Sequence, residues 1–284
     1  MSCFHNIKIG RQQVKLSDRL GTIQSIAEQY HKQFEYDYIW DTCCDHGQLG
    51  AALLKNGISS QLFFVDIVPE LVANVELNLK QYFPNQTNQW HTLCEDVSSL
   101  PLDKAANING KMAVSSKAAD DVRHLIIIAG IGGDLMLEFI TQLNQRFPDL
   151  ALDFLLCPVH HQFALRKQLK EMEFRLRHEV VLEENNRFYE VLLVTNDVKP
   201  KGTKHTKFMN SEGEFVTTGS SSQPKRIDVA GEALWFYKTE NEKSILERYL
   251  TKTLTHYRRM QKGNNEFANT AIAAYERVKI ENGS

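Results

Sequence analysis

The sequence predicts an α/β fold in which a parallel sheet is covered by helices on both faces and is followed by a smaller helical region. Five apolar runs alternate with segments of helical periodicity, and continuous apolar strands are typical of sheets buried on both faces. Each of the first three runs ends in a carboxylate, at Asp41, Asp66 and Asp96. Because the carboxyl ends of parallel strands meet at one edge, a ligand site is expected there.

The expected elements follow one another from an amphipathic helix that begins at Ser17, which serves as its N-cap. Apolar runs without helical periodicity are assigned to strands, and segments with apolar residues every three to four positions to helices. The expected strands are 38–41, 61–66, 90–96, 124–129 and 154–157, and the helices between them are 49–55, 69–82, 134–145 and 162–172.

Two polar segments and a helical tail indicate the domain organisation. Residues 103–121 are rich in Ala, Asn, Lys and Ser and predict an insertion, whereas 200–228 predicts a linker or a hairpin around Phe208 and Phe215. The tail predicts two helices that form an αα-hairpin. The expected parts are a sheet domain over 1–198, a linker or hairpin over 199–230 and a helical hairpin over 231–284, with helices at 233–261 and 265–280.

Composition excludes several protein classes. The chain of 284 residues has no apolar stretch long enough to span a membrane, and its first residues lack the apolar core of a secretion signal. Its five cysteines are an odd number scattered over strands and a loop, which favours reduced thiols. We therefore expect a cytoplasmic enzyme without a disulfide framework.

The charge is unevenly distributed along the chain. Its net charge is −2, yet residues 199–262 contain 13 Lys and Arg against 7 Asp and Glu. A basic module attached to a more acidic domain is typical of a protein that binds nucleic acid. The alternative is a solvated helical surface joined to a polar linker.

The loop from Asp41 to Gly47 resembles a nucleotide-binding loop that has lost glycines. A strand, a tight turn and a helix start direct backbone N–H groups toward a ligand. Class I methyltransferases, which bind S-adenosylmethionine (SAM), have Asp-x-Gly-x-Gly-x-Gly at this place. This chain has Cys43 and Asp45 at the first two glycine positions. An ordinary turn between strand and helix remains the alternative for this loop taken alone.

Several short motifs, in order over residues 16–195, together resemble the bacterial tRNA adenine-22 N1-methyltransferases, the TrmK family. That family joins a Rossmann-like SAM-binding domain to a helical, coiled-coil-like C-terminal domain, and methylates N1 of an adenine in tRNA. The resemblance implies a Rossmann-like class I methyltransferase fold, SAM as the cofactor and tRNA as the partner. The motifs are Leu16-Ser17-x-Arg19-Leu20, Asp41-x-x-x-Asp45-His46, Ile128-Ala129-Gly130-Ile131-Gly132-Gly133, Pro158 with Leu165-Arg166, and Phe188-Tyr189-Glu190.

Position assigns the cofactor contacts. Asp66 lies roughly 20 residues after the loop, where such folds place a ribose ligand. Asp96 is expected to accept a hydrogen bond from the adenine amine, and Asp41 to orient the loop. The expected cofactor-binding residues are Asp41, Cys43, Asp45, Gly47, Asp66, Ile67, Asp96, Val97, Ala129, Gly130 and Ile131.

The chemistry indicates a catalytic role for Asp45. Adenine N1 has an in-plane lone pair, so it attacks a sulfonium methyl group without prior deprotonation and becomes positively charged. The enzyme must supply alignment and a negative environment. Asp45 is expected to stabilise that charge or to accept a proton from the exocyclic amine; the alternative is that it only caps the next helix. Ala129-Gly130-Ile131 replaces the Asn-Pro-Pro-Tyr of enzymes that methylate an exocyclic amine, which favours a ring nitrogen.

The expected substrate contacts are more dispersed. Arg166 either holds phosphates or belongs to the solvated face of its helix, and Tyr189 either stacks on a base or packs in the core. No metal is expected, because Cys157 to His161 has no second pair of ligands at zinc spacing. The expected substrate-binding residues are Arg19, His46, Pro158, Arg166, Tyr189, Arg258 and Arg259.

Two departures from the TrmK pattern keep alternatives open. Cys43 stands where the family has Gly, and Cys157-Pro158-Val159 stands where it has Gln-Pro-Asn. The alternatives are methylation of another RNA or base, a nicotinamide-dependent dehydrogenase, and a non-catalytic RNA-binding protein with a vestigial cofactor fold. A dehydrogenase is disfavoured because Asp45 would repel a pyrophosphate.

Overall fold

The computed structural model describes residues 16–104, 122–197, 207–209, 215–217, 223–262 and 265–283. Most of its strands belong to one sheet, and two further pairs lie outside it. The strands are β1 (Tyr38–Thr42), β2 (Gln61–Asp66), β3 (Trp90–Cys94), β4 (Arg123–Ala129), β5 (Ala151–Cys157), β6 (Arg175–Glu184), β7 (Arg187–Thr195), β8 (Lys207–Met209), β9 (Phe215–Thr217), β10 (Lys225–Arg226), β11 (Phe236–Tyr237) and β12 (Glu281–Asn282).

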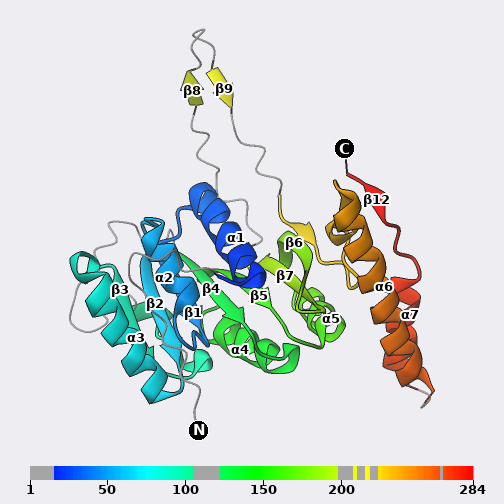
Figure 1. Cartoon of the computed structure of the whole chain (residues 1–284), viewed down its shortest axis with the longest axis horizontal. Helices are drawn as coiled ribbons and strands as arrows, with labels where there is room; N and C mark the ends of the chain where they lie inside the picture. Colours follow the sequence, from blue (N-terminus) through cyan, green and yellow to red (C-terminus); the bar gives the residue numbers. More distant parts are fainter. Residues whose placement is uncertain are drawn as a thin grey trace.

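The main sheet has the strand order β10-β6-β7-β5-β4-β1-β2-β3 (Figure 1). β1 to β5 pair in parallel, as the sequence predicts, but β7 and β6 run antiparallel to their neighbours. The reason is the connection between these two strands, in which only Asn185 and Asn186 separate them. Both have positive φ, at 50° and 61°. Such a two-residue turn can join only antiparallel strands.

Helices cover both faces of this sheet, and their bounds agree closely with those expected. Ser17 caps the first helix, and its side chain accepts a hydrogen bond from the Leu20 N–H at 3.4 Å. The helices are α1 (Asp18–Phe34), α2 (Gln48–Lys55), α3 (Pro69–Tyr82), α4 (Gly133–Arg146), α5 (Gln162–Glu171), α6 (Glu240–Gln261) and α7 (Glu266–Tyr275), with short 3₁₀ helices η1 (Pro84–Gln86), η2 (Val97–Ser99) and η5 (Ala233–Trp235).

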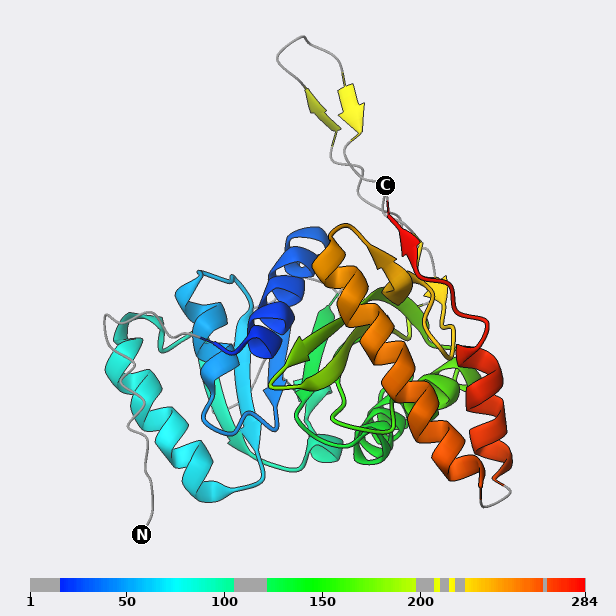
Figure 2. The same cartoon turned by 45° about the vertical axis from the view of Figure 1, so that its right-hand side comes forward.

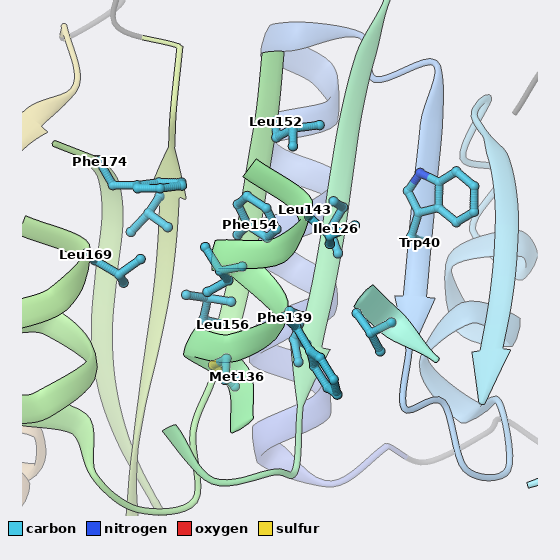
Figure 3. Packing of buried hydrophobic residues seen from close by; sticks show 14 of the residues in the cluster. Trp40, Ile126, Met136, Phe139, Leu143, Leu152, Phe154, Leu156, Leu169 and Phe174 are labelled. Atoms are coloured by element: carbon cyan, nitrogen blue, oxygen red, sulfur yellow. The ribbon is translucent and has the colours of Figure 1, made fainter. Parts of the chain in front are cut away.

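Alternate residues of the central strands supply two separate cores. In β4, Ile126 and Ile128 point toward α4, α5 and η2, whereas Leu125 and Ile127 point toward α1, α2 and α3. Figure 3 shows the first core, where α4 residues such as Phe139 and Leu143 lie over the sheet. The two faces are thus buried, which explains why the strands are continuous apolar runs.

The C-terminal helices α6 and α7 lie side by side next to β6, β7 and α5 (Figures 1 and 2). The expected helix from residue 233 is wrong at its start, because 233–237 form η5 and β11. The cause is Thr239, whose side chain forms a capping box with Glu242 and so begins α6 at Glu240. The expected break at Gly263-Asn264 and residues 105–121 of the expected insertion at 103–121 lie outside the described residues. The sequence left a linker or a hairpin open around Phe208 and Phe215, and β8 and β9 form an antiparallel pair there, as the hairpin alternative requires.

Candidate active site

Asp41, in β1, is joined by a hydrogen bond to α2. Its side chain is buried, and its Oδ2 accepts a hydrogen bond from the Gly50 N–H at 2.9 Å. A Cβ at Gly50 would lie 2.3 Å from the Phe64 ring. Only glycine therefore lets α2 approach closely enough for this bond, a requirement that the sequence motif alone did not reveal.

The loop between β1 and α2 keeps the backbone shape of a glycine-rich loop, although Cys43 and Asp45 replace two of its glycines. Cys43 and Asp45 both have φ of 51°, and Gly47 has φ of 67°. This left-handed region is uncommon for residues with a Cβ, although Asp tolerates it better than most. Residues held in such conformations concentrate at ligand sites. The two substitutions thus change the side chains that line the loop and leave its backbone path glycine-like.

Asp66 connects the end of β2 to this loop. Its Oδ2 accepts from the Asp45 N–H at 3.0 Å and its Oδ1 from the Val68 N–H at 3.1 Å. Each carboxylate oxygen can still accept a further hydrogen bond. The neighbouring Ile67 side chain is 65% exposed, an unusual position for a large apolar residue. Asp66 and Ile67 therefore present a carboxylate and an apolar surface side by side at the sheet edge.

The third strand contributes less than expected. Asp96 caps η2, accepting a hydrogen bond from the Ser98 N–H at 2.8 Å. Val97 is buried in the core between the sheet and α4. A contact between Val97 and the cofactor, as the sequence predicts, would therefore involve only its main chain, because its side chain points into the protein.

Negative charge accumulates at this edge. Burial raises the pKa of Asp41 to about 7; the Gly50 N–H opposes this shift, and the nearby Asp66 charge adds to it. The pKa of Cys43 is raised to about 11, most strongly by burial and further by the charges of Asp66, Asp41 and Asp96. This thiol is therefore not a nucleophile at neutral pH. A positively charged ligand would stabilise such a cluster. SAM carries a sulfonium and an ammonium group, so this cluster of carboxylates fits it.

The carboxyl end of β4 leaves room for a ligand. Gly130 is exposed with φ of 85°, and a Cβ there would meet no atom within 4 Å. At Gly132, by contrast, a Cβ would lie 2.2 Å from the His160 ring. The Ile131 carbonyl accepts the Val159 N–H at 2.9 Å and fixes the loop after β5. Ala129 and Ile131, both half-buried, flank Gly130 in this open segment.

Two expected substrate-binding residues are in the wrong place for that role. Pro158 is buried where β5 ends. Arg166 has a fully buried side chain, in which Nε lies 2.6 Å from Glu190 Oε2 and Nη1 lies 2.7 Å from Glu179 Oε2. The two carboxylates raise the pKa of Arg166 against the effect of burial. Arg166 is thus an interior ion-pair partner and has no surface on which to hold a phosphate.

The network around Arg166 joins the sheet to the C-terminal region. Arg166 Nη1 donates to the Asp228 carbonyl at 3.2 Å, and the Tyr249 hydroxyl donates to Glu190. Glu179 Oε1 accepts backbone N–H groups of the segment that leads into α6, from Glu232 at 2.9 Å and from Leu234 at 3.3 Å. Sequence reasoning missed this network.

The other expected substrate residues are accessible to different degrees. The Arg19 guanidinium is mostly buried, lies 5.4 Å from the centre of the Tyr189 ring and pairs with Glu184. His46 is exposed, with Nε2 3.6 Å from Asp45 Oδ1. Arg258 Nη2 lies 2.9 Å from Glu276 Oε1 on the exposed side of α6, and Arg259 is exposed beside it. These residues form three separate groups.

Neither a membrane span nor a metal centre is found in the part of the chain that the structure describes. No described helix is both long and apolar enough to cross a bilayer. No cluster of three or more His, Cys, Asp or Glu among the described residues has the arrangement of a metal site.

Comparison with known structures places the fold. The B. subtilis M1A22 tRNA methyltransferase TrmK matches with a TM-score of 0.54 and 18% identity, over 93% of this chain and 95% of that one. The M. capricolum TrmK bound to S-adenosyl-homocysteine gives 0.57 and 16%, over 92% and 96%. A Streptococcus pneumoniae structure with bound SAM gives 0.58 and 16%, over 92% and 98%. No curated protein sequence matches the chain.

The family model described as "Methyltransferase domain" matches residues 16–192, which run from α1 into β7. They include Asp41, Asp66 and Asp96, the carboxylates that form the acidic edge of the sheet. This match excludes the dehydrogenase alternative. The chain belongs to the methyltransferase domain family and is a class I SAM-dependent methyltransferase.

Proposed function

We propose that this protein methylates N1 of an adenine in tRNA, at the position numbered 22. The observation that carries the proposal is the extent of the similarity to the B. subtilis M1A22 tRNA methyltransferase, which includes 93% of this chain and thus the helical pair as well as the sheet. In this proposal residues 1–198 form the catalytic part, 199–230 connect, and 231–284 contribute to tRNA binding.

The acidic edge is proposed to hold SAM. Asp66 accepts the ribose hydroxyls while its two backbone hydrogen bonds keep it in place, and Ile67 packs against the adenine ring. Asp96 accepts from the adenine amine. Asp41 holds α2 against β1 and contributes negative charge beside the cationic end of the cofactor. Bound there, SAM supplies a methyl group on a positively charged sulfur.

Asp45 is proposed as the catalytic residue. As the bond from N1 to the methyl carbon forms, the bond from sulfur to that carbon breaks, and the positive charge moves to the adenine. The Asp45 side chain is 70% exposed, and its backbone N–H is fixed on Asp66, so its carboxylate can face this charge. Stabilising a developing charge in this way lowers the barrier. Adenine N1 attacks with its own lone pair, so the reaction needs no base to deprotonate N1 and no nucleophilic thiol on the enzyme.

The test is methyl transfer from isotopically labelled SAM to tRNA, with the nucleosides identified by mass spectrometry. The proposal expects labelled 1-methyladenosine in tRNA that has adenine at position 22 and none in the same tRNA with guanine there. Label in another nucleoside would establish a different RNA or base as the substrate. Absence of any label, together with normal SAM binding in calorimetry, would contradict tRNA methylation.

A further inference from the structure

A cavity of about 650 Å³ lies between the sheet domain and the C-terminal helices. Its walls come from the loop after β5, the β6–β7 hairpin, α6 and α7. This volume is typical of a site for a small organic group rather than of a packing defect. The residues that line it lie between two parts of the chain that are far apart in sequence, so it exists only in the folded protein.

The cavity is separate from the acidic edge but adjoins it. None of the expected cofactor residues lines it. The nearest boundary is His160, which lines the cavity and whose ring faces Gly132 at the end of β4. His161, also in the lining, pairs with Asp134 at 2.6 Å. A group held here would lie beside the methyl-transfer site without occupying it.

The walls are aromatic. Phe188 and Tyr249 have ring centres 5.6 Å apart, and both line the cavity. Tyr257 and Phe267, which also line the cavity, have ring centres 6.2 Å apart at an edge-to-face angle. Phe188 and Phe267 are only half-buried, although both are large apolar residues. Aromatic faces of this kind bind flat heterocycles by stacking.

Basic side chains are also among the residues that line the cavity. Lys252 Nζ lies 5.3 Å from the Phe188 ring centre and donates to the Asn186 carbonyl at 3.3 Å. Arg187 and His256 are exposed and also line the cavity. Acids are present too: Asp134 pairs with His161, and Glu183 pairs with Arg248. Both acids thus already have a partner, and Lys252 and Arg187 are the cations that suit a phosphate next to a bound base.

We propose that this cavity binds an unpaired nucleobase of the RNA substrate other than the base that is methylated. The flat base stacks between Phe188 and the aromatic residues of α6 and α7, and its phosphate contacts Lys252 and Arg187. The inference rests on the proposed function, since it requires an RNA substrate. It explains why the C-terminal pair is held against the sheet by a buried ion-pair network: both sides must stay in place to form the cavity.

The test fills the cavity with a side chain. Thr253 is half-buried in the lining, and Thr255 is an exposed neighbour on α6 outside it, so Thr253→Trp and Thr255→Trp form a matched pair. Full-length proteins are titrated with a fluorescein-labelled single-stranded RNA of eight nucleotides and with a duplex of the same length. We expect Thr253→Trp to weaken single-strand binding by about tenfold, from the loss of a stacked base. Duplex binding and SAM affinity should stay within about twofold, and Thr255→Trp should behave as wild type.

Equal binding of the single strand by Thr253→Trp and wild type overturns the inference, as does a wild-type protein that shows no preference for single strand over duplex. If Thr253→Trp fails to fold, RNA that contains 5-iodouridine is cross-linked to the wild-type chain instead. Adducts on Phe188, Tyr257 or Phe267 are expected, and adducts that are only elsewhere overturn the inference. The methylation assay separates the two proposals, because single-strand binding through the cavity without 1-methyladenosine formation refutes the proposed function alone.

Discussion

Two clusters of buried charge, one at the acidic edge and one around Arg166, are built in opposite ways. At the edge, Asp41 and Asp66 accept hydrogen bonds from backbone N–H groups. Around Arg166, a full cation lies between the Glu179 and Glu190 carboxylates, with both sides completely buried. Backbone dipoles balance the first cluster only partly. In the second cluster a cation faces both carboxylates, and backbone N–H groups and the Tyr249 hydroxyl donate further hydrogen bonds to them.

This difference distinguishes a ligand site at the edge from a structural network, the joint that connects the sheet to the C-terminal region. Burial raises the pKa of Asp41, and the nearby Asp66 charge adds to this shift, so a cationic ligand at the edge would favour the ionised carboxylate. The Arg166 network already holds its own cation, and its side chains are completely buried, so a ligand from solvent cannot reach it. Substitutions in the two clusters should therefore differ in kind, with a loss of stability around Arg166 and a loss of SAM binding or turnover at the acidic edge.

Arg166→Met should lower the free energy of unfolding by about 3–5 kcal/mol, because it leaves two buried carboxylates without their cation. Urea denaturation followed by circular dichroism measures this loss. Lys170→Met, on the exposed side of the same helix, is the matched control and should change stability by less than about 0.5 kcal/mol. A loss below about 1 kcal/mol for Arg166→Met would mean that the network contributes little to the joint.

Asp45→Asn should reduce turnover by roughly 10²-fold while SAM affinity changes little, because the amide keeps the shape of the loop but removes the charge opposite the methylated base. Single-turnover methylation assays and calorimetry measure the two quantities. Parallel losses of turnover and SAM binding would instead assign Asp45 to the cofactor loop alone.

Asp66→Ala should weaken SAM binding by ~1–3 kcal/mol, because it removes a charged acceptor of hydrogen bonds and releases the Asp45 and Val68 N–H groups. Isothermal titration calorimetry gives the affinity. Glu70→Ala, an exposed carboxylate in the first turn of α3, controls for the simple loss of negative charge. Unchanged affinity in Asp66→Ala would remove this residue from the cofactor site.

SAM affinity should rise by about threefold to tenfold as the pH increases from 6 to 7.5, because Asp41 ionises in this window and a cation favours the ionised form. In the protein without SAM, the raised pKa means that ionisation of Asp41 lowers the stability of the folded state. The contribution of Asp41 to stability is lost as the pH rises from about 4 to about 7. Calorimetry at several pH values tests the affinity, and in Asp41→Asn the pH dependence should disappear. A pH-independent wild type would exclude this coupling.

Neutralising Arg258 and Arg259 together should weaken tRNA binding and lower the slope of its salt dependence by ~1–2 units, if these exposed cations contact phosphates. SAM affinity should not change, because both residues lie on α6, outside the acidic edge. Glu276, which now pairs with Arg258, would be left on the surface at little cost to stability. An unchanged salt slope would make α6 a packing element only.

The sequence by itself determined the parallel part of the sheet, from β1 to β5, the order of its elements and the family. Apolar runs such as 61–66 and helical periods such as 69–82 recur as β2 and α3 with the same bounds, because side-chain spacing sets local structure directly. The strand-terminal acids also follow from sequence, since the carboxyl ends of parallel strands share one edge. The positive φ at Cys43 and Asp45 does not, because side-chain identity alone disfavours it.

Only the tertiary structure decided the position of Arg166 and the existence of the cavity. A signal for the first was available: Phe163, Arg166 and Leu169 are spaced three apart on one apolar stripe of α5. An arginine on such a stripe is buried only if carboxylates from remote segments reach it, and Glu179 and Glu190 come from β6 and β7. The cavity likewise needs the β6–β7 hairpin and α6 to face each other. Contacts between distant segments have no period along the chain, so only the folded protein shows them.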